Sequence, residues 1–181
     1  MSSLTTKKAI AYTFKDLLKE KSFNKITIND IAKRSDINRQ TFYYHFQDIR
    51  DLVEWICIEE FNKNLHSKGE YEKWEDKFLA IFEIMKEEQV CVENIYHSVS
   101  LEILRKNLYE MVYPIIYSEI EEQVKEKNLT KQDKVFIANF YKYAFVSIVL
   151  EWIGKGMEED AEIIVNKVSN LVTGTIVRVC F

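Results

Sequence analysis

The amino-acid sequence predicts an all-α protein, in which a three-helix head is followed by a larger helical bundle, about nine helices in total. Glycine and proline are scarce, with four and one among 181 residues, whereas the turns of an all-β protein use both heavily. Hydrophobic residues make up 47% and charged residues 30% of the chain, which is an ordinary balance for a globular protein with a core. Apolar residues also recur at helical spacing, which predicts long helices joined by short connections.

The first predicted helix spans about residues 6–21, where one apolar stripe is formed by Ile10, Phe14, Leu17 and Leu18. Residues 22–25 interrupt this pattern. Thr27 then matches a helix N-cap, and Asp30, three residues further, matches the spacing of a capping box. A short second helix is therefore expected to start after Thr27 and to end near residues 34–36.

A third predicted helix spans residues 39–46, with Asn38 as its N-cap. One face of this helix is expected to pack inward through two aromatic residues four positions apart, Phe42 and Phe46. The fourth predicted helix has Asp48 as its N-cap and extends to about residue 66, and residues 67–69 are the best linker candidate in the chain.

The remaining sequence predicts five helices, over about residues 71–88, 90–99, 100–127, 131–154 and 159–180. Within the fourth of these, residues 143–150 are apolar nearly all round. A helix that is apolar on all sides must be buried on all sides, so we expect this segment to be fully covered.

Charge is distributed unevenly along the chain. Residues 1–50 hold ten Lys and Arg against five Asp and Glu, a net charge of +5, whereas the other 131 residues hold 15 against 24, a net charge of −9. A basic head on an acidic body is expected if only the head touches phosphate. A solvated surface with no partner can show the same bias, so charge alone does not decide between these interpretations.

The second and third predicted helices are short and are separated by a tight turn, which is the pattern of a helix-turn-helix motif. The second helix of such a motif enters the major groove of DNA and presents its amino-terminal residues to base edges. Donors and acceptors suited to base edges or phosphates are Arg39, Gln40, Thr41, Tyr43, Tyr44 and His45. As a cap, Asn38 leaves backbone N–H groups that favour a nearby phosphate.

Arg39 is the best candidate for a base reader, because arginine pairs with guanine through two hydrogen bonds. The alternative is a solvated surface arginine. The DNA interpretation requires that Arg39, Tyr43 and Tyr44 face the solvent, with Lys25 and Lys33 around them. If these side chains are buried, the DNA interpretation is wrong.

Residues 27–52 resemble the DNA-binding head of the TetR family, and the Thr-Phe-Tyr-Tyr-His-Phe sequence at residues 41–46 is the most specific part of the match. The resemblance covers about residues 7–60 by motif. Residues 37–46 and 151–157 are also similar to the dihydroxyacetone kinase regulator subgroup of that family.

The resemblance implies roles for individual residues. Thr27 is expected to contact phosphate and Asn29 to reach a base, while Arg39, Gln40 and Thr41 lie in the major groove. Tyr43 and His45 are expected to hold backbone phosphates.

The chain also departs from the family pattern at the start of the fourth helix, because Ile49 stands where relatives usually carry a phosphate-binding lysine. Either Arg50 or Lys25 compensates for this change, or the affinity for DNA is lower.

The resemblance further implies a homodimer joined through the last two helices, a pseudo-palindromic double-stranded operator, and an effector that acts on the body. We accordingly expect residues 1–50 to form the DNA-binding domain and residues 51–181 to form the regulatory and dimerisation domain. The effector is either a small molecule or a protein, and both repression and activation stay open. The candidates for a ligand pocket are Phe78, Phe82, Tyr96, Tyr113 and Tyr143, although their helical spacing is first of all that of core residues.

The sequence predicts no enzyme, cofactor or metal site. Ser98 and Ser100 beside His97 lack the acid and the oxyanion signature of a catalytic triad, and the group of Cys91, Glu93, His97 and Glu102 is too loosely spaced for zinc. The three cysteines lie far apart, and we expect them to be reduced in a cytoplasmic protein without a signal peptide or a membrane span. The competing function is a helical protein–protein interaction module, which predicts no salt-dependent binding to DNA.

Overall fold

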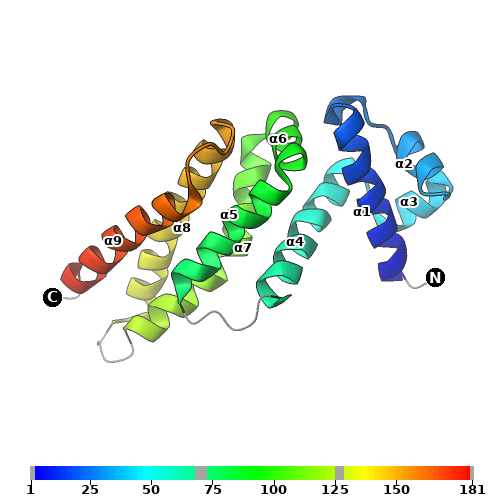
Figure 1. Cartoon of the computed structure of the whole chain (residues 1–181). Helices are drawn as coiled ribbons and strands as arrows, with labels where there is room; N and C mark the ends of the chain where they lie inside the picture. The colour runs from blue at the N-terminus through cyan, green and yellow to red at the C-terminus, as the bar shows by residue number, and fades with distance from the viewer. Residues whose placement is uncertain (1–2, 68–72, 125–128, 180–181) are drawn as a thin grey trace.

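The computed structural model describes residues 3–67, 73–124 and 129–179, and within these ranges it contains nine α-helices and no strand (Figure 1). The predicted all-α fold class is therefore confirmed. The helices are α1 (Ser3–Glu20), α2 (Ile28–Arg34), α3 (Arg39–His45), α4 (Ile49–Ser67), α5 (Trp74–Glu87), α6 (Gln89–Ser98), α7 (Leu101–Gln123), α8 (Lys131–Gly154) and α9 (Ala161–Val179), with a short 3-10 helix at Phe23–Lys25. Figure 1 shows α1, α2 and α3 gathered at one end, with α4 between them and the remaining helices.

The head forms around a set of buried side chains that we call the head core. It contains the predicted stripe of α1 together with residues of α2, α3 and α4, namely Ile10, Phe14, Leu17, Leu18, Ile31, Phe42, Phe46, Leu52, Val53 and Ile56. Phe42 and Phe46 are 0% and 2% exposed, so their predicted place in the core is confirmed. The head core also takes in Cys91, Ile95 and Val99 from α6 and the residue after it, which joins the head to the rest of the molecule.

Caps fix where the head helices begin. The Thr27 hydroxyl accepts the Asp30 N–H while the Asp30 carboxylate accepts the Thr27 N–H, so the predicted capping box is present. At the start of α4, the Asp48 carboxylate accepts the N–H groups of Arg50 and Asp51 at 2.7 and 2.9 Å. The predicted helix starts are therefore correct at α2 and α4, whereas α1 begins three residues earlier than expected.

The body is built on two pairs of helices, α7 with α8 and α5 with α9, and the rings of Phe78 and Phe145 join α5 to α8. A second set of buried side chains, the body core, fills the space between them; its aromatic members are Trp74, Phe78, Phe82, Phe145 and Trp152. Of the predicted linker, Ser67 is the last residue of α4, and residues 68–69 lie outside the described residues. The predicted helix ends at residues 71, 127 and 180 also fall outside them.

The prediction that residues 143–150 are fully covered is wrong for the single chain. Phe145, Val146 and Val149 are buried in the body core, but Tyr143 is 50% exposed, and Ala144 and Ser147 are exposed as well. The exposed face continues toward the start of α8, where Phe136 and Phe140 are 74% and 59% exposed. The reason is geometric, because the helices that pack against α8 from within the chain cover only one of its faces. Among the described helices, α8 passes a length and composition test for a membrane span, a test that core helices of soluble proteins also pass.

Candidate nucleic-acid interface

The turn between α2 and α3 sets the position of the candidate recognition helix. Asp36 adopts a left-handed conformation with φ of 53°, which aspartate tolerates better than most residues. The Ile37 N–H then donates to the Ala32 carbonyl at 3.0 Å, and the Ser35 N–H donates to the Ile31 carbonyl at 2.9 Å. This is a Schellman-type helix end, and it turns the chain so that α3 starts immediately afterwards.

Helix α3 has one buried face and one exposed face. Phe42 is 0% exposed, while Tyr43 and Tyr44 are 49% and 81% exposed and Arg39 also faces the solvent. The exposure that the DNA interpretation requires of these three side chains is therefore present. The guanidinium of Arg39 donates to the Tyr43 hydroxyl at 3.4 Å and lies 5.9 Å from the centre of the Tyr43 ring, so the two side chains lie together along the exposed face of α3.

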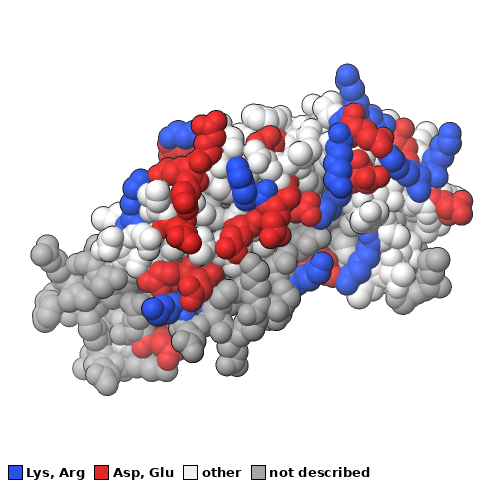
Figure 2. Space-filling model, in the orientation of Figure 1, with Lys and Arg blue, Asp and Glu red and all other residues white. Residues whose placement is uncertain are grey.

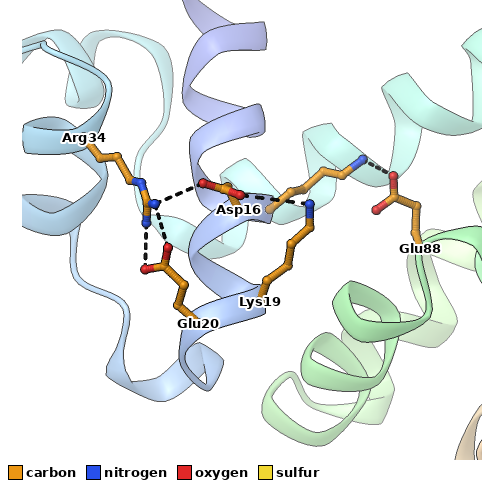
Figure 3. Close-up of polar contacts among 6 residues, drawn as sticks. Asp16, Lys19, Glu20, Arg34 and Glu88 are labelled. Atoms are coloured by element: carbon orange, nitrogen blue, oxygen red, sulfur yellow. Dashed lines mark hydrogen bonds and ion pairs between the residues drawn. The ribbon is translucent and has the colours of Figure 1, made fainter.

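The basic residues of the head fall into two groups. Arg34 is held on the face of α1 by Glu20, at 2.6 and 2.8 Å, and by Asp16 at 3.2 Å (Figure 3). The hydrogen bonds from Arg34 also lower the pKa of the Glu20 carboxyl, which stays ionised and keeps Arg34 in place. The second group forms no ion pair within the described residues, and it includes Lys25, Lys33 and Arg39. Their charge is therefore available to an anionic partner.

Two of the predicted contact residues already use some of their hydrogen-bonding groups to cap helices. Both donors of Thr27, its N–H and its hydroxyl, are bonded to the Asp30 carboxylate at 2.8 and 2.7 Å. A phosphate contact from these two groups therefore requires that the phosphate replace Asp30. The side-chain oxygen Oδ1 of Asn38 accepts hydrogen bonds from both the N–H and the hydroxyl of Thr41, at 2.7 and 2.9 Å. Its NH₂ group has no acceptor among the described residues and keeps its donors.

The eleven predicted DNA contacts all reach the surface. Nine are exposed, namely Lys25, Thr27, Asn29, Lys33, Asn38, Arg39, Gln40, Tyr43 and Tyr44, and two are half-buried, Thr41 and His45. The ring of His45 meets the ring of Tyr44 edge-on, with 5.0 Å between their centres. Their individual roles on DNA stay predictions.

The departure at Ile49 has a structural counterpart. Ile49 is half-buried and packs against the head core. This position therefore holds a packing side chain in this protein, in place of the lysine expected from the family pattern. Of the two proposed substitutes, Arg50 borders a cavity between head and body, whereas Lys25 is exposed at the end of the 3-10 helix.

The predicted pocket residues do not line one cavity within the described part of the chain. Phe82 is fully buried between Phe145 and Trp152. Phe78 borders a groove of about 300 Å³ against α8 and α9, and Tyr96 alone of the five borders the cavity between α4 and α8. Contact of any of the five with a ligand stays a prediction.

The other two predicted pocket residues enclose a lysine of their own chain. The ammonium group of Lys142 lies 4.6 Å from the ring centre of Tyr143 and 5.2 Å from that of Tyr113. Tyr109 contributes a third ring at 5.0 Å. These cation–π contacts join α7 to α8, which gives both tyrosines a structural role.

The charge asymmetry of the sequence is visible on the surface. In Figure 2 acidic side chains gather over the described part of the body, whereas long basic side chains stand out over the head. Three acids of the head are engaged by Arg34, Lys19 and Lys21, whereas Lys25, Lys33 and Arg39 form no ion pair among the described residues.

Comparisons with known proteins agree with this geometry. The family model "Bacterial regulatory proteins, tetR family" matches residues 15–56, and the model "Transcriptional regulator C-terminal region" of the same family matches residues 72–174. The HTH-type dhaKLM operon transcriptional activator DhaS of Lactococcus lactis subsp. lactis (strain IL1403) is 27% identical over 161 residues, which cover 85% of this chain and 82% of that protein.

Two solved structures extend the likeness to three dimensions. The dihydroxyacetone kinase operon activator DhaS superposes with a TM-score of 0.75 at 26% identity, covering 96% of this chain and 97% of that one. A TetR transcriptional regulator from Streptococcus agalactiae 2603V superposes with a TM-score of 0.66 at 21% identity and 94% coverage of both chains, a likeness of fold alone.

Proposed function

The chain belongs to the TetR family of bacterial transcription regulators, and we propose that it binds a pseudo-palindromic DNA operator as a homodimer whose α3 helices read the sequence. The matched family and the relative DhaS are transcription regulators, which are not enzymes. The proposal adds the operator, the dimer and the residues that read DNA, and it places the protein in the cytoplasm.

The observation that carries the proposal is the exposed face of α3. Arg39 lies there beside Tyr43 with no carboxylate partner among the described residues, whereas Arg34 is fixed by two acids of α1. An arginine that is held along a helix but not neutralised can present both of its terminal donors to a guanine. Lys25 and Lys33 add charge for phosphate contacts, which set position and affinity more than sequence choice.

The dimer is supported by the uncovered apolar faces of α8 and α9. Phe136, Phe140 and Tyr143 of α8 are half to three-quarters exposed, and Leu171 of α9 is 69% exposed. A two-fold axis through these helices would cover both sets at once. It would also carry two heads, whose recognition helices could enter major grooves about 34–36 Å apart.

Regulation is proposed to pass through α4. This helix contributes Leu52, Val53 and Ile56 to the head core and also packs against α5 and α7. A small molecule or protein that favours one position of α4 could change operator affinity by roughly 1–3 kcal/mol. The relative DhaS is named as an activator of the dhaKLM operon; both activation and repression are compatible with this scheme.

The decisive experiment is fluorescence anisotropy with duplexes from the gene's own upstream region and with a random duplex, at about 50 mM and about 200 mM salt. We expect nanomolar binding to the specific duplex, with affinity that falls steeply as salt rises. Arg39→Ala should weaken specific binding by about 1–3 kcal/mol, roughly fivefold to more than a hundredfold. Arg34→Ala is the matched control, because it removes the same type of side chain from the same head.

Two results would contradict the proposal. One is binding no tighter than to random DNA and indifferent to Arg39→Ala, and the other is an equal loss of specificity in Arg34→Ala. Binding that does not depend on salt would instead favour the competing protein–protein module.

A further inference from the structure

Glu88 is the single residue between α5 and α6, and we call this place the α5–α6 corner. Its N–H donates to the Ile84 carbonyl at 3.2 Å, at the end of α5, and its own carbonyl accepts the Val92 N–H at 3.0 Å, at the start of α6. The backbone of Glu88 is therefore held by both helices. The point from which its side chain leaves the body is fixed with it.

The α5–α6 corner is also bonded to the turn between α8 and α9. The ammonium of Lys86 donates to the Met157 carbonyl at 2.9 Å, and the side-chain amide of Gln89 donates to the Gly156 carbonyl at 3.3 Å. The side chain of Met157 is itself buried in the body core. Three neighbouring residues thus anchor the corner on the body, two of them through the turn that joins α8 to α9.

From this corner the Glu88 carboxylate reaches the head. It pairs with the ammonium of Lys15 on α1, which lies 73 residues away in the sequence (Figure 3). The side chains of Lys15 and Glu88 are 17% and 37% exposed. Salt and water therefore screen this pair less than they screen a fully exposed one.

The next residue of α1 carries the constraint to the helix-turn-helix. Asp16, adjacent to Lys15, pairs with the guanidinium of Arg34 on α2 at 3.2 Å. Glu20, further along α1, accepts two hydrogen bonds from the same guanidinium (Figure 3). A short stretch of α1 is therefore bonded to the body by one side chain and to α2 by others, so α2 and α3 follow the orientation of α1.

Apolar packing alone does not fix the angle between the head and the body. The two cores meet through side chains such as Leu104, which packs against both, and hydrophobic contact is non-directional. A charged hydrogen bond to a carboxylate that is held in place has a preferred distance and direction. The pair of Lys15 and Glu88 therefore selects one orientation of the head among those that the apolar contact allows.

We propose that Glu88 is a positioning residue for DNA recognition, which sets through Lys15 the angle at which the head holds α3 on the body. This inference rests on the proposed function, because the angle matters for binding only if two heads must reach the half-sites of one operator. A dimer binds half-sites at a set spacing. The angle of each head then decides which spacing is bound best.

Four variants of the full-length protein test the proposal. Glu88→Gln and Lys15→Met remove the ion pair from opposite sides, and the exchange of charges, Lys15→Glu with Glu88→Lys, restores it. The matched control is Glu151→Gln, which removes an ion pair with Lys155 inside α8. Because this pair joins two residues of one helix, its loss should leave the head where it is.

Residual dipolar couplings of the backbone amides, measured without DNA, give the orientation of α1, α2 and α3 relative to α7 and α8. We expect Glu88→Gln and Lys15→Met to change this orientation, and we expect the exchange of charges and Glu151→Gln to keep it. An unchanged orientation in both single variants would overturn the proposal. If one single variant does not fold, the other decides.

Operator spacing provides the functional readout. The specific duplex is compared by fluorescence anisotropy with duplexes that have one base pair added or removed at its centre. Glu88→Gln and Lys15→Met should reduce the preference for the natural spacing by roughly fivefold or more, and the exchange of charges should restore it. A loss of stability alone would leave this ratio unchanged, because it lowers the folded fraction equally for every duplex.

The outcomes separate this inference from the proposed function. If the head turns in Glu88→Gln but the unmodified protein binds no specific DNA, the link between Glu88 and the head is supported and the regulator is contradicted. If specific binding keeps the same spacing preference in both single variants, the regulator is supported and the positioning role of Glu88 is overturned.

Discussion

The carboxylate of Asp30 has two kinds of partner at the start of α2. It accepts the N–H and the hydroxyl of Thr27, and it pairs with the ammonium of Lys21 at 2.8 Å. The hydrogen bond from Lys21, and after it those from Thr27, hold the pKa of Asp30 well below its usual range. Because the side chain of Asp30 is 35% exposed, solvent screens part of this effect.

The stability that Asp30 contributes should depend on pH. A lowered folded pKa means that the contribution is present above the unfolded pKa of about 3.9 and is lost as the pH falls through the folded value. Asp30→Asn should therefore lower the Tm at pH 7, and the difference from the unmodified protein should shrink below about pH 4. Thermal unfolding followed by circular dichroism across this range measures it, and a difference that stays constant with pH would contradict the assignment.

At Gly154, the last residue of α8, a nearby tyrosine leaves no room for a side chain. A Cβ atom at this position would lie 2.6 Å from the Tyr96 hydroxyl and 3.2 Å from the ring carbon that bears it. The overlap is relieved only if the Tyr96 ring leaves its place or α6 shifts, so Gly154→Ala should destabilise the fold by about 1–3 kcal/mol. This outweighs the gain in helix propensity, which is at most about 1 kcal/mol.

Urea unfolding measures the loss in Gly154→Ala, and a second variant tests its cause. Tyr96→Phe in the same chain removes the nearest overlapping atom and should restore part of the stability. A neutral Gly154→Ala, or no recovery in the double variant, would mean that Tyr96 moves aside freely.

At the residue scale, the sequence predicts contacts between residues that lie a few positions apart. The spacing of Thr27 and Asp30 predicts their reciprocal hydrogen bonds, and the four-residue spacing of Phe42 and Phe46 predicts their burial. It could not find the ion pair between Lys15 and Glu88, which lie 73 residues apart, because no local spacing relates them. It also could not show that Arg34 is neutralised while Arg39 is not, which depends on how α1 faces α2.

At the scale of elements, nine helices follow from periodicity within the described residues, because a stripe of apolar side chains identifies a helix and its buried face. Periodicity does not say which chain covers that face. This is why residues 143–150 were expected to be buried all round, whereas Tyr143 is 50% exposed. It is also why the sequence suggests aromatic residues for a ligand pocket, whereas the walls of the cavity between head and body are largely aliphatic.

The exposed face of α8 leads to a prediction about assembly. Phe140→Glu replaces a ring that is 59% exposed, and a two-fold axis near α8 would bring two such carboxylates together without solvent. Since an unpaired charge is costly when desolvated, the variant should be monomeric at concentrations where the unmodified protein is a dimer. Sedimentation velocity measures this.

A matched control for Phe140→Glu is Ile58→Glu on α4, where the side chain is 46% exposed and lies away from α8 and α9. This variant should remain dimeric. If Phe140→Glu dimerises normally, or if both variants dissociate, the interface does not run through the exposed face of α8.

At the scale of the whole molecule, the head and the body share side chains. The head core includes Cys91, Ile95 and Val99, although these residues lie more than thirty positions beyond α3 in the sequence. The proposed division at residue 50 stays a prediction, because α4 and α6 both connect the two cores. A signal that reaches α6 can therefore act on the head directly as well as through α4.

This arrangement predicts that a cavity made in α6 weakens the head. Ile95 is 6% exposed and belongs to the head core, whereas Ile120 on α7 is 3% exposed and belongs to the body core. Replacing either with alanine should cost about 2–5 kcal/mol. At a similar loss of global stability, Ile95→Ala should accelerate amide hydrogen exchange in α1 more than Ile120→Ala does, because it removes a wall of the head core itself. If the two variants leave exchange in α1 equally protected, the head holds its structure without α6, and coupling between body and head must pass through α4 alone.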